Sequence, residues 1–175
     1  MSPSSISQNR ASQNGLGVSE SFMLLLVSAV QFVNILDFMI VMPLGPDFAR
    51  DLGIPLSQLG VIGGSYTFSA SIAGVLGSKY LDRFDRRSAL AVSMFGLVLG
   101  TVSAGFAWNQ ASLMAARLIA GAFGGPATSL ALSVIADVVP PERRGRALGI
   151  VMGAFAVASV LGVPLSLELA ARFGW

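Results

Sequence analysis

The sequence of 175 residues contains neither cysteine nor histidine. Without cysteine there is no disulfide framework and no thiolate metal site, and without histidine the usual imidazole ligand is missing. A Ser–His–Asp triad is excluded for the same reason, and the chain has no Gly-x-x-x-x-Gly-Lys-Ser/Thr phosphate loop. We therefore expect neither an enzyme nor a metal site. Any proton chemistry near neutral pH must use carboxylates instead of imidazole.

Charged residues are also scarce. They make up 11% of the chain and apolar residues 54%, whereas an average soluble domain is about 25% charged. The apolar residues form long runs, which favours a lipid bilayer over a large soluble core. The formal net charge of +2 is too small to indicate nucleic-acid binding. The composition predicts an all-α, polytopic membrane protein whose first partner is the bilayer.

The long apolar runs predict five membrane-spanning helices. A hydrocarbon core about 30 Å thick needs roughly 20 helical residues to cross it. On this criterion the spans lie near 21–43, 58–80, 88–108, 112–139 and 147–171, after a flexible tail over 1–20. The first run is too long for the apolar region of a secretory signal. Several spans carry Gly-x-x-x-Gly pairs, which are typical of closely packed membrane helices.

The basic residues in the linkers predict the orientation. Eight of them fall on the side of the N-terminus and two on the other side: Arg10, Lys79, Arg83, Arg86, Arg87, Arg143, Arg144 and Arg146 against Arg50 and Arg172. Because cytoplasmic loops carry the excess of Lys and Arg, we expect a cytoplasmic N-terminus in a plasma membrane, the inner membrane if the source is bacterial. Trp108 and Trp175 then fall at the outer interface, where aromatic rings are favoured.

Two charged residues lie inside predicted spans. Arg117 stands about six residues into the fourth span and Asp37 about six residues from the outer end of the first. The two spans run in opposite directions, so both residues lie roughly 9 Å below the outer edge. A charge in the membrane is costly and is therefore a candidate functional residue. We expect Asp37 and Arg117 to share a polar cavity, in which a direct ion pair can form; the alternative is that each reaches the interface separately.

The linker between the second and third spans carries a motif. It reads Gly77-Ser78-Lys79-Tyr80-Leu81-Asp82-Arg83-Phe84-Asp85-Arg86-Arg87. This stretch resembles the cytoplasmic signature of the major facilitator superfamily, in which Asp82, Arg83, Arg86 and Arg87 match. Ser78 and Asp85 stand where the family has glycine.

Three further stretches extend the resemblance over nearly all the chain after residue 20. The run Asn34–Pro46 resembles the first helix of drug and metabolite efflux members, and Arg117–Gly121 resembles a fourth-helix motif whose arginine is associated with proton coupling. Gly162-Val163-Pro164 is similar to the antiporter motif of efflux members, although Val163 replaces a glycine. The resemblance implies a multi-pass proton antiporter that exports a small molecule. It needs no cofactor because the proton gradient supplies the energy.

The resemblance also assigns roles to several residues. It implies that Asn34, Asp37, Tyr66 and Arg117 line the transport cavity or couple it to protons, and that Gly162 and Pro164 belong to the antiporter motif. In the linker, Asp82 can accept hydrogen bonds from a neighbouring helix N-terminus, and Arg86 can pair with Asp137 at the end of the fourth span. Such a cluster can hold one conformation of a rocking transporter closed. The plain alternative is that the linker arginines only set topology.

The family fold has twelve helices in two halves, so five spans resemble an incomplete N-terminal half over residues 21–175. We expect a sixth helix and a C-terminal half to be missing and the 175-residue chain alone to transport nothing. Two alternatives stay open. The chain is a piece of an uptake or sugar or nucleoside transporter, or it is a small structural or regulatory membrane protein that binds another protein through its glycine-lined faces.

Overall fold

The computed structural model describes residues 20–80 and 85–174, and within them it is helical without a strand. Five helical stretches are long and apolar enough to cross a membrane. They are α2 (Glu20–Ile40), α4 (Leu59–Tyr80), α5 (Arg86–Gly105), α6 (Gln110–Val138) and the stretch made of α7 (Pro141–Val157), the π-helical turn η3 (Ala158–Gly162) and α8 (Val163–Phe173). The expected all-α membrane fold with five spans is confirmed. The expected N-terminal tail falls almost wholly outside the described residues.

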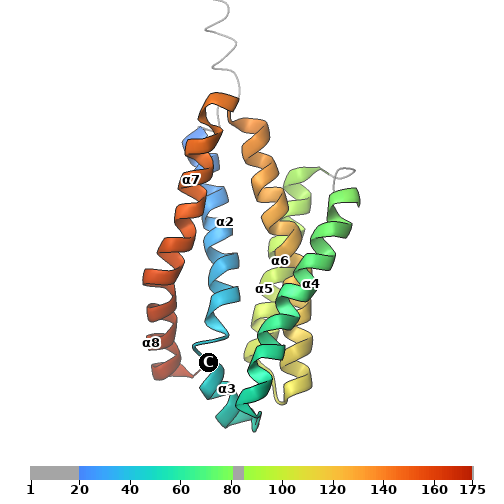
Figure 1. Cartoon of the computed structure of the whole chain (residues 1–175), viewed down its shortest axis with the longest axis vertical. Coiled ribbons are helices and arrows are strands. Elements are labelled where there is room, and N and C mark those ends of the chain that lie inside the picture. The colour runs from blue at the N-terminus through green and yellow to red at the C-terminus, as the bar shows by residue number, and fades with distance from the viewer. Residues whose placement is uncertain (1–19, 81–84, 175) are drawn as a thin grey trace, which may run out of the picture.

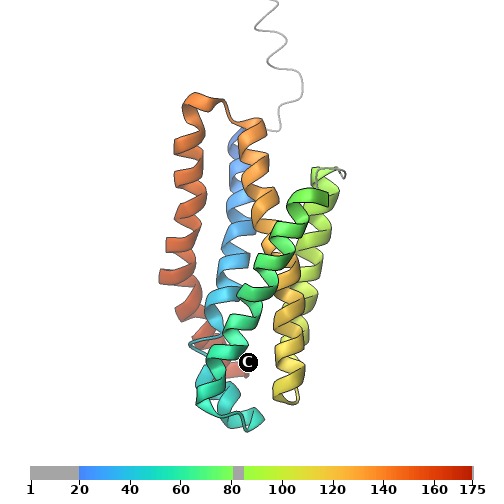
Figure 2. The ribbon, with the colours of Figure 1, turned by 45° about the vertical axis from the view of Figure 1, so that its right-hand side comes forward.

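The long helices run up and down in sequence, with α6 at the centre of the bundle (Figure 1). Helix α6 packs against α4, α5 and α2, and α2 packs in turn against α7. In the view turned by 45° about the vertical axis, α4 crosses α6 obliquely while α7 stands at the opposite edge beside α2 (Figure 2). This arrangement brings the first and fourth spans into contact, so the two charged residues inside those spans can meet.

Two glycines explain how closely α6 approaches α4. A Cβ atom at Gly121 or Gly125 would overlap the backbone carbonyl oxygen of Tyr66 or Ala70, respectively. In a membrane, helices associate through this kind of close packing and not through the hydrophobic effect. The Gly149/Gly153 pair on α7 is different, because a Cβ there meets no described atom within 4 Å.

The linkers hold more regular structure than the sequence indicates. The first contains the short helix α3 (Gly45–Leu52) and the 3₁₀ turn η1 (Leu56–Gln58). Helix α3 has Pro46 in its first turn and ends at Gly53, whose φ of 65° requires the left-handed conformation that glycine adopts at no cost. The fourth linker, expected over 140–146, is helical from Pro141 onward. The fixed φ of proline suits the first turn of a helix, so α7 begins earlier than expected.

Polar side chains cap α5 and α6. Asp85 accepts a hydrogen bond from the backbone N–H of Ser88 at 3.2 Å and caps α5. Asn109 and Ser112 cap α6 reciprocally, with the Asn109 Oδ1 accepting from the Ser112 N–H at 2.8 Å. Asp85 is one of the two positions that depart from the family signature. Its carboxylate satisfies an N–H that would otherwise lack a helical partner, so the acidic residue has a structural use there.

Candidate transport site

Asp37 on α2 and Arg117 on α6 form a buried ion pair. The Arg117 Nη1 and Nη2 atoms lie 3.2 Å from the two carboxylate oxygens of Asp37, and Nη1 also donates to the Asp37 carbonyl oxygen at 3.1 Å. The exposed fractions are 5% for Asp37 and 3% for Arg117. A two-pronged contact of this kind orients both groups, and burial makes separation costly because an unpaired charge would remain in a poorly solvated site. The pairing expected from the sequence is present.

A third residue, Thr101 on α5, contacts the same carboxylate. Its Oγ1 lies 2.6 Å from Asp37 Oδ1 and 2.9 Å from the Leu97 carbonyl oxygen, and its single proton serves one acceptor at a time. Thr101 is a candidate that the sequence alone does not indicate. Threonine is common in membrane helices, where it usually bonds to its own backbone, so the sequence offers no signal that separates this position from others.

Asn34 and Tyr66 form a second polar cluster one turn along α2. The Tyr66 hydroxyl donates to Asn34 Oδ1 at 2.5 Å, and the Asn34 amide donates to the carbonyl of Gly124 at 2.9 Å and to Thr128 Oγ1 at 2.5 Å. Both side chains are buried. The cluster ties α2, α4 and α6 together, and Asn34 stands one helical turn from Asp37 of the ion pair.

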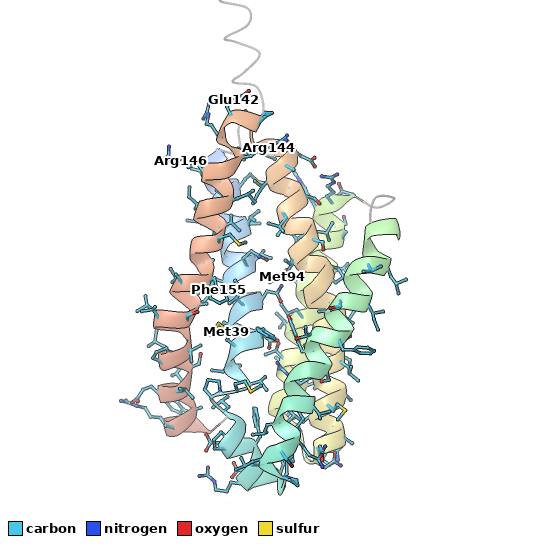
Figure 3. The ribbon with its side chains drawn as sticks, viewed as in Figure 1. Met39, Met94, Glu142, Arg144, Arg146 and Phe155 are labelled. Carbon is cyan, nitrogen blue, oxygen red and sulfur yellow. The ribbon has the colours of Figure 1, made fainter. Side chains whose placement is uncertain are left out.

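An open recess of about 180 Å³ adjoins this cluster. Its lining combines aromatic rings, small residues and the amide of the cluster: Asn34, Ile35, Phe38, Tyr66, Ala70, Gly124, Gly125, Thr128 and Phe155. A larger hollow shares several of these residues and adds Thr67 and Ser71 from α4. Figure 3 shows Phe155 on α7 near the middle of the bundle. Mostly apolar walls with few fixed polar groups are typical of small-molecule sites.

Of the remaining polar residues on α4, two do not serve this recess. Ser65 donates to the carbonyl of Ile62 within its own helix at 2.7 Å, and Ser69 donates to the carbonyl of Leu118 on α6 at 2.7 Å. The Ser69 hydroxyl therefore joins α4 to α6, whereas the Ser65 hydroxyl is satisfied within α4.

The charged linker between α4 and α5 is described only from Asp85 onward. Arg86 forms an ion pair with Asp137 at the end of α6 and lies 3.4 Å from the Ser133 carbonyl oxygen. The pairing suggested by the sequence is therefore present, while Arg87 is exposed. Asp82 and Arg83 lie outside the described residues. The contact between Arg86 and Asp137 joins the start of α5 to the end of α6 at one end of the bundle.

The turn from α6 to α7 stands at that same end. Arg144 lies across the end of α6 and donates to the carbonyls of Val139 at 3.0 Å and Ala136 at 2.5 Å. Figure 3 shows Glu142, Arg144 and Arg146 gathered there. A cation at the C-terminus of a helix is favoured because the last carbonyls carry partial negative charge.

Gly162 and Pro164 lie where the fifth span is distorted. Pro164 has no N–H to donate to the carbonyl four residues earlier, and the span widens into the π-helical turn η3 just before it. Gly162 is buried at the end of this turn, and a Cβ there would come within 2.9 Å of Leu36 on α2. The motif residues thus place the altered turn directly against the first span.

Comparisons with known proteins agree on one family. The sequence model of the Major Facilitator Superfamily matches residues 27–175. The chain is similar to an uncharacterised MFS-type transporter of Bacillus subtilis, with 29% identity over 74% of this chain and 33% of the relative. It is also similar to a triacylglyceride transporter of Mycolicibacterium hassiacum, with 30% identity over 91% of this chain and 29% of the relative.

A third relative is a chloramphenicol resistance protein of Streptomyces lividans, 27% identical over 86% of this chain and 38% of the relative. The chain spans about a third of the length of these relatives. The family match covers all five described spans except the start of the first, and the buried pair, the recess and the distorted fifth span all lie within it. The chain belongs to the Major Facilitator Superfamily of membrane transporters.

Proposed function

We propose that this chain forms the N-terminal part of a proton-coupled exporter of a small molecule in a plasma membrane. The observation that carries the proposal is the almost fully buried ion pair between Asp37 and Arg117. Asp37 itself does not line the recess with mostly apolar walls, but Asn34 and Phe38 on the same helix do. A membrane protein that needed only stability would gain little from such a pair, because desolvating two charges offsets most of their attraction. An ionisable residue inside a membrane is by default a functional residue.

The ion pair between Asp37 and Arg117 indicates how a proton would change the conformation. A proton that reaches Asp37 neutralises the carboxylate and leaves the Arg117 guanidinium buried with no counter-charge. This state is unfavourable, so protonation favours a conformation in which Arg117 finds another acceptor or water. Substrate in the adjacent recess contacts Asn34 and Tyr66, which share a helix crossing with the pair. Proton and substrate binding are then linked through the position of α2 against α6.

A second set of contacts serves as the conformational latch. The ion pair between Arg86 and Asp137 stands at the end of the bundle that we place in the cytoplasm. A cluster that forms in one state and opens in the other biases a rocking motion between two halves of a transporter. The excess of basic residues at this end supports a cytoplasmic N-terminus.

Export is the favoured direction. The Gly162 and Pro164 motif supports it, as does the similarity to a chloramphenicol resistance protein. In this proposal a sixth helix and a C-terminal half complete the cavity, so the 175-residue chain alone transports nothing. An uptake transporter of the same family is the second candidate, because Val163 departs from the antiporter motif.

The test begins with the coding DNA beyond the codon for Trp175. If the reading frame continues, its whole product is produced in cells that lack their own drug exporters, beside the 175-residue chain. We expect the whole product to lower the accumulation of radiolabelled chloramphenicol, and a protonophore to abolish the effect. If the accumulation of chloramphenicol rises, or if the protonophore does not change it, proton-coupled export is contradicted. If a stop codon follows instead, co-purification with another membrane protein would support the structural or regulatory alternative.

A further inference from the structure

Two hollows between α2 and α7 join into one groove. The first, of about 240 Å³, has Arg143 and Arg146 in its wall, close to the residue where α2 begins. The second, of about 580 Å³, continues along the two helices. The hollows share three wall residues: Ser21, Leu24 and Ile150. We call the joined space the α2–α7 groove. Among the described residues, it has no wall residue in common with the recess beside Asn34 and Tyr66.

The long part of the groove is lined with apolar surface that lies open. Its described wall residues are apolar except for two serines, and the exposed fractions of Leu25, Ile150 and Val157 are 67%, 47% and 48%. Helix α7 rises roughly 16 Å between Arg146 and Val157. This rise is close to half the thickness of a hydrocarbon core of about 30 Å. The groove therefore offers apolar surface over the depth of one lipid leaflet.

The mouth of the groove is basic. Arg146 is exposed and forms no ion pair with any residue that the structure describes. Arg144 does not line the groove, because it bonds to carbonyls at the end of α6, and Figure 3 shows Arg144 and Arg146 on different sides of the start of α7. Glu142 stands at the tip of the same turn and is likewise not a wall residue. The described wall of the mouth thus contains two guanidinium groups and no carboxylate.

Guanidinium groups above an apolar groove suit a phospholipid. Arginine binds phosphate through parallel, charge-assisted hydrogen bonds. Basic pockets between membrane helices bind anionic headgroups, and a zwitterionic lipid is a weaker ligand because its headgroup carries a cation of its own. A soluble phosphate ion would use the arginines and leave the apolar walls below them uncovered. The continuity of mouth and groove therefore favours a lipid.

We propose that an anionic glycerophospholipid binds in the α2–α7 groove, with its headgroup phosphate at Arg143 and Arg146 and one acyl chain along the apolar walls. In the orientation proposed above, the lipid comes from the cytoplasmic leaflet, where anionic lipids give the membrane a negative surface potential. The lipid packs between the helix that carries Asp37 and the helix that leads into the distorted turn η3. Binding itself does not depend on transport.

Native mass spectrometry of the 175-residue chain tests the headgroup contact. The purified chain in detergent is titrated with phosphatidylglycerol or with phosphatidylcholine that has the same acyl chains. We expect phosphatidylglycerol to bind at least about fivefold more tightly, and Arg146→Gln to weaken its binding about fivefold, the effect of one basic residue near a membrane surface. Arg146→Lys keeps the charge and should retain most of the affinity. The control is Arg87→Gln, which removes an exposed cation at the start of α5 and should leave the affinity unchanged.

A second pair of variants tests the acyl-chain contact. A Cβ atom at Gly153 or at Gly149 meets no described atom within 4 Å, so α7 can hold a larger side chain at either position. Only Gly153 lines the groove. Gly153→Leu should therefore abolish most of the phosphatidylglycerol binding, whereas Gly149→Leu should not change it. Circular dichroism checks that both variants keep the helix content of the wild type.

Three results would overturn the lipid site. The first is equal affinity of the wild type for the two lipids. The second is an effect of Arg87→Gln as large as that of Arg146→Gln, because the basic end would then attract lipid without a defined site. The third is an equal effect of the two leucine variants. If the reading frame continues, the whole product is titrated as well, and loss of the lipid there also overturns the site, since another part of the protein would then cover the groove.

Discussion

Arg117 holds both carboxylate oxygens of Asp37 at 3.2 Å across the contact between α6 and α2, although the residues stand 80 positions apart. The contact joins two helices that run in opposite directions, and both side chains are almost fully buried. The pair joins the two spans and lies one helical turn along α2 from the cluster of Asn34 and Tyr66.

The pair predicts strong coupling in a double-mutant cycle. Asp37→Asn and Arg117→Gln should each lower stability by roughly 3–5 kcal/mol, because each leaves a buried polar partner unmatched. The double variant should cost clearly less than the sum of the two. Unfolding of each variant in detergent micelles is the measurement.

The matched control is the exposed pair of Arg172 and Glu168 on α8, which lie four residues apart. Its coupling should be no more than about 0.3–0.5 kcal/mol. Additive effects at Asp37 and Arg117 would mean that the contact does not organise the bundle. In the whole transporter, the exchange of the two residues (Asp37→Arg with Arg117→Asp) should restore more activity than either single change retains.

Thr101 is expected to support the carboxylate of Asp37. Thr101→Val keeps the shape but removes the donor, so it should lower stability by about 1–3 kcal/mol. Thr101→Ser retains the hydroxyl and should stay close to the wild type. Ser103→Ala, which removes only a hydroxyl bonded to the Leu99 carbonyl of its own helix, should be nearly neutral. If Thr101→Ser proves as harmful as Thr101→Val, the role of the residue is packing and not hydrogen bonding.

The contact between α6 and α4 predicts a difference between two glycines. Gly125→Ala should destabilise the bundle by about 1–3 kcal/mol, since the new methyl group overlaps the Ala70 carbonyl and the helices must separate. Gly149→Ala on α7 meets open space and should be neutral or stabilising by up to about 1 kcal/mol, the helix-propensity gain of alanine. Thermal unfolding of the two variants compares them, and equal effects would contradict the packing described for α6.

The charge asymmetry predicts the sidedness of the linkers. In intact bacterial cells, a cysteine that replaces Ser57 in η1 should react with a membrane-impermeant maleimide. A cysteine that replaces Gly145 in α7 should react only after the membrane is opened. Both residues are exposed in the bundle, so burial does not distort the comparison. The opposite pattern would place the N-terminus outside and remove the latch from the cytoplasm.

The sequence reveals the membrane class, the five spans and the main ion pair for clear physical reasons. Length and composition decide whether a helix can cross a bilayer. Charges inside spans are rare, so Asp37 and Arg117 stood out, and the opposite directions of their helices placed them at one depth. The early start of α7 at Pro141 also had a signal, because proline favours the first turn of a helix.

The remaining features depend on how each helix is rotated about its axis. Apolar residues lie on all sides of these spans, so periodicity does not show which face meets which neighbour. For that reason the sequence did not distinguish Thr101, which faces Asp37, from other hydroxyl residues. It likewise does not separate Ser69, whose hydroxyl bonds to the Leu118 carbonyl on α6, from Thr67 and Ser71, which line the hollow.

The central claim is that Asp37 carries the coupling proton, and proton release on substrate addition tests it most directly. The whole product of the reading frame is placed in inside-out vesicles with an acid interior, and the small molecule that it exports is added while a pH-sensitive dye reports the interior pH. We predict that protons leave the vesicles that contain the wild type on this addition, whereas none leave the vesicles that contain the Asp37→Asn variant, although that variant still binds the molecule. Proton release by Asp37→Asn equal to that of the wild type would contradict the account.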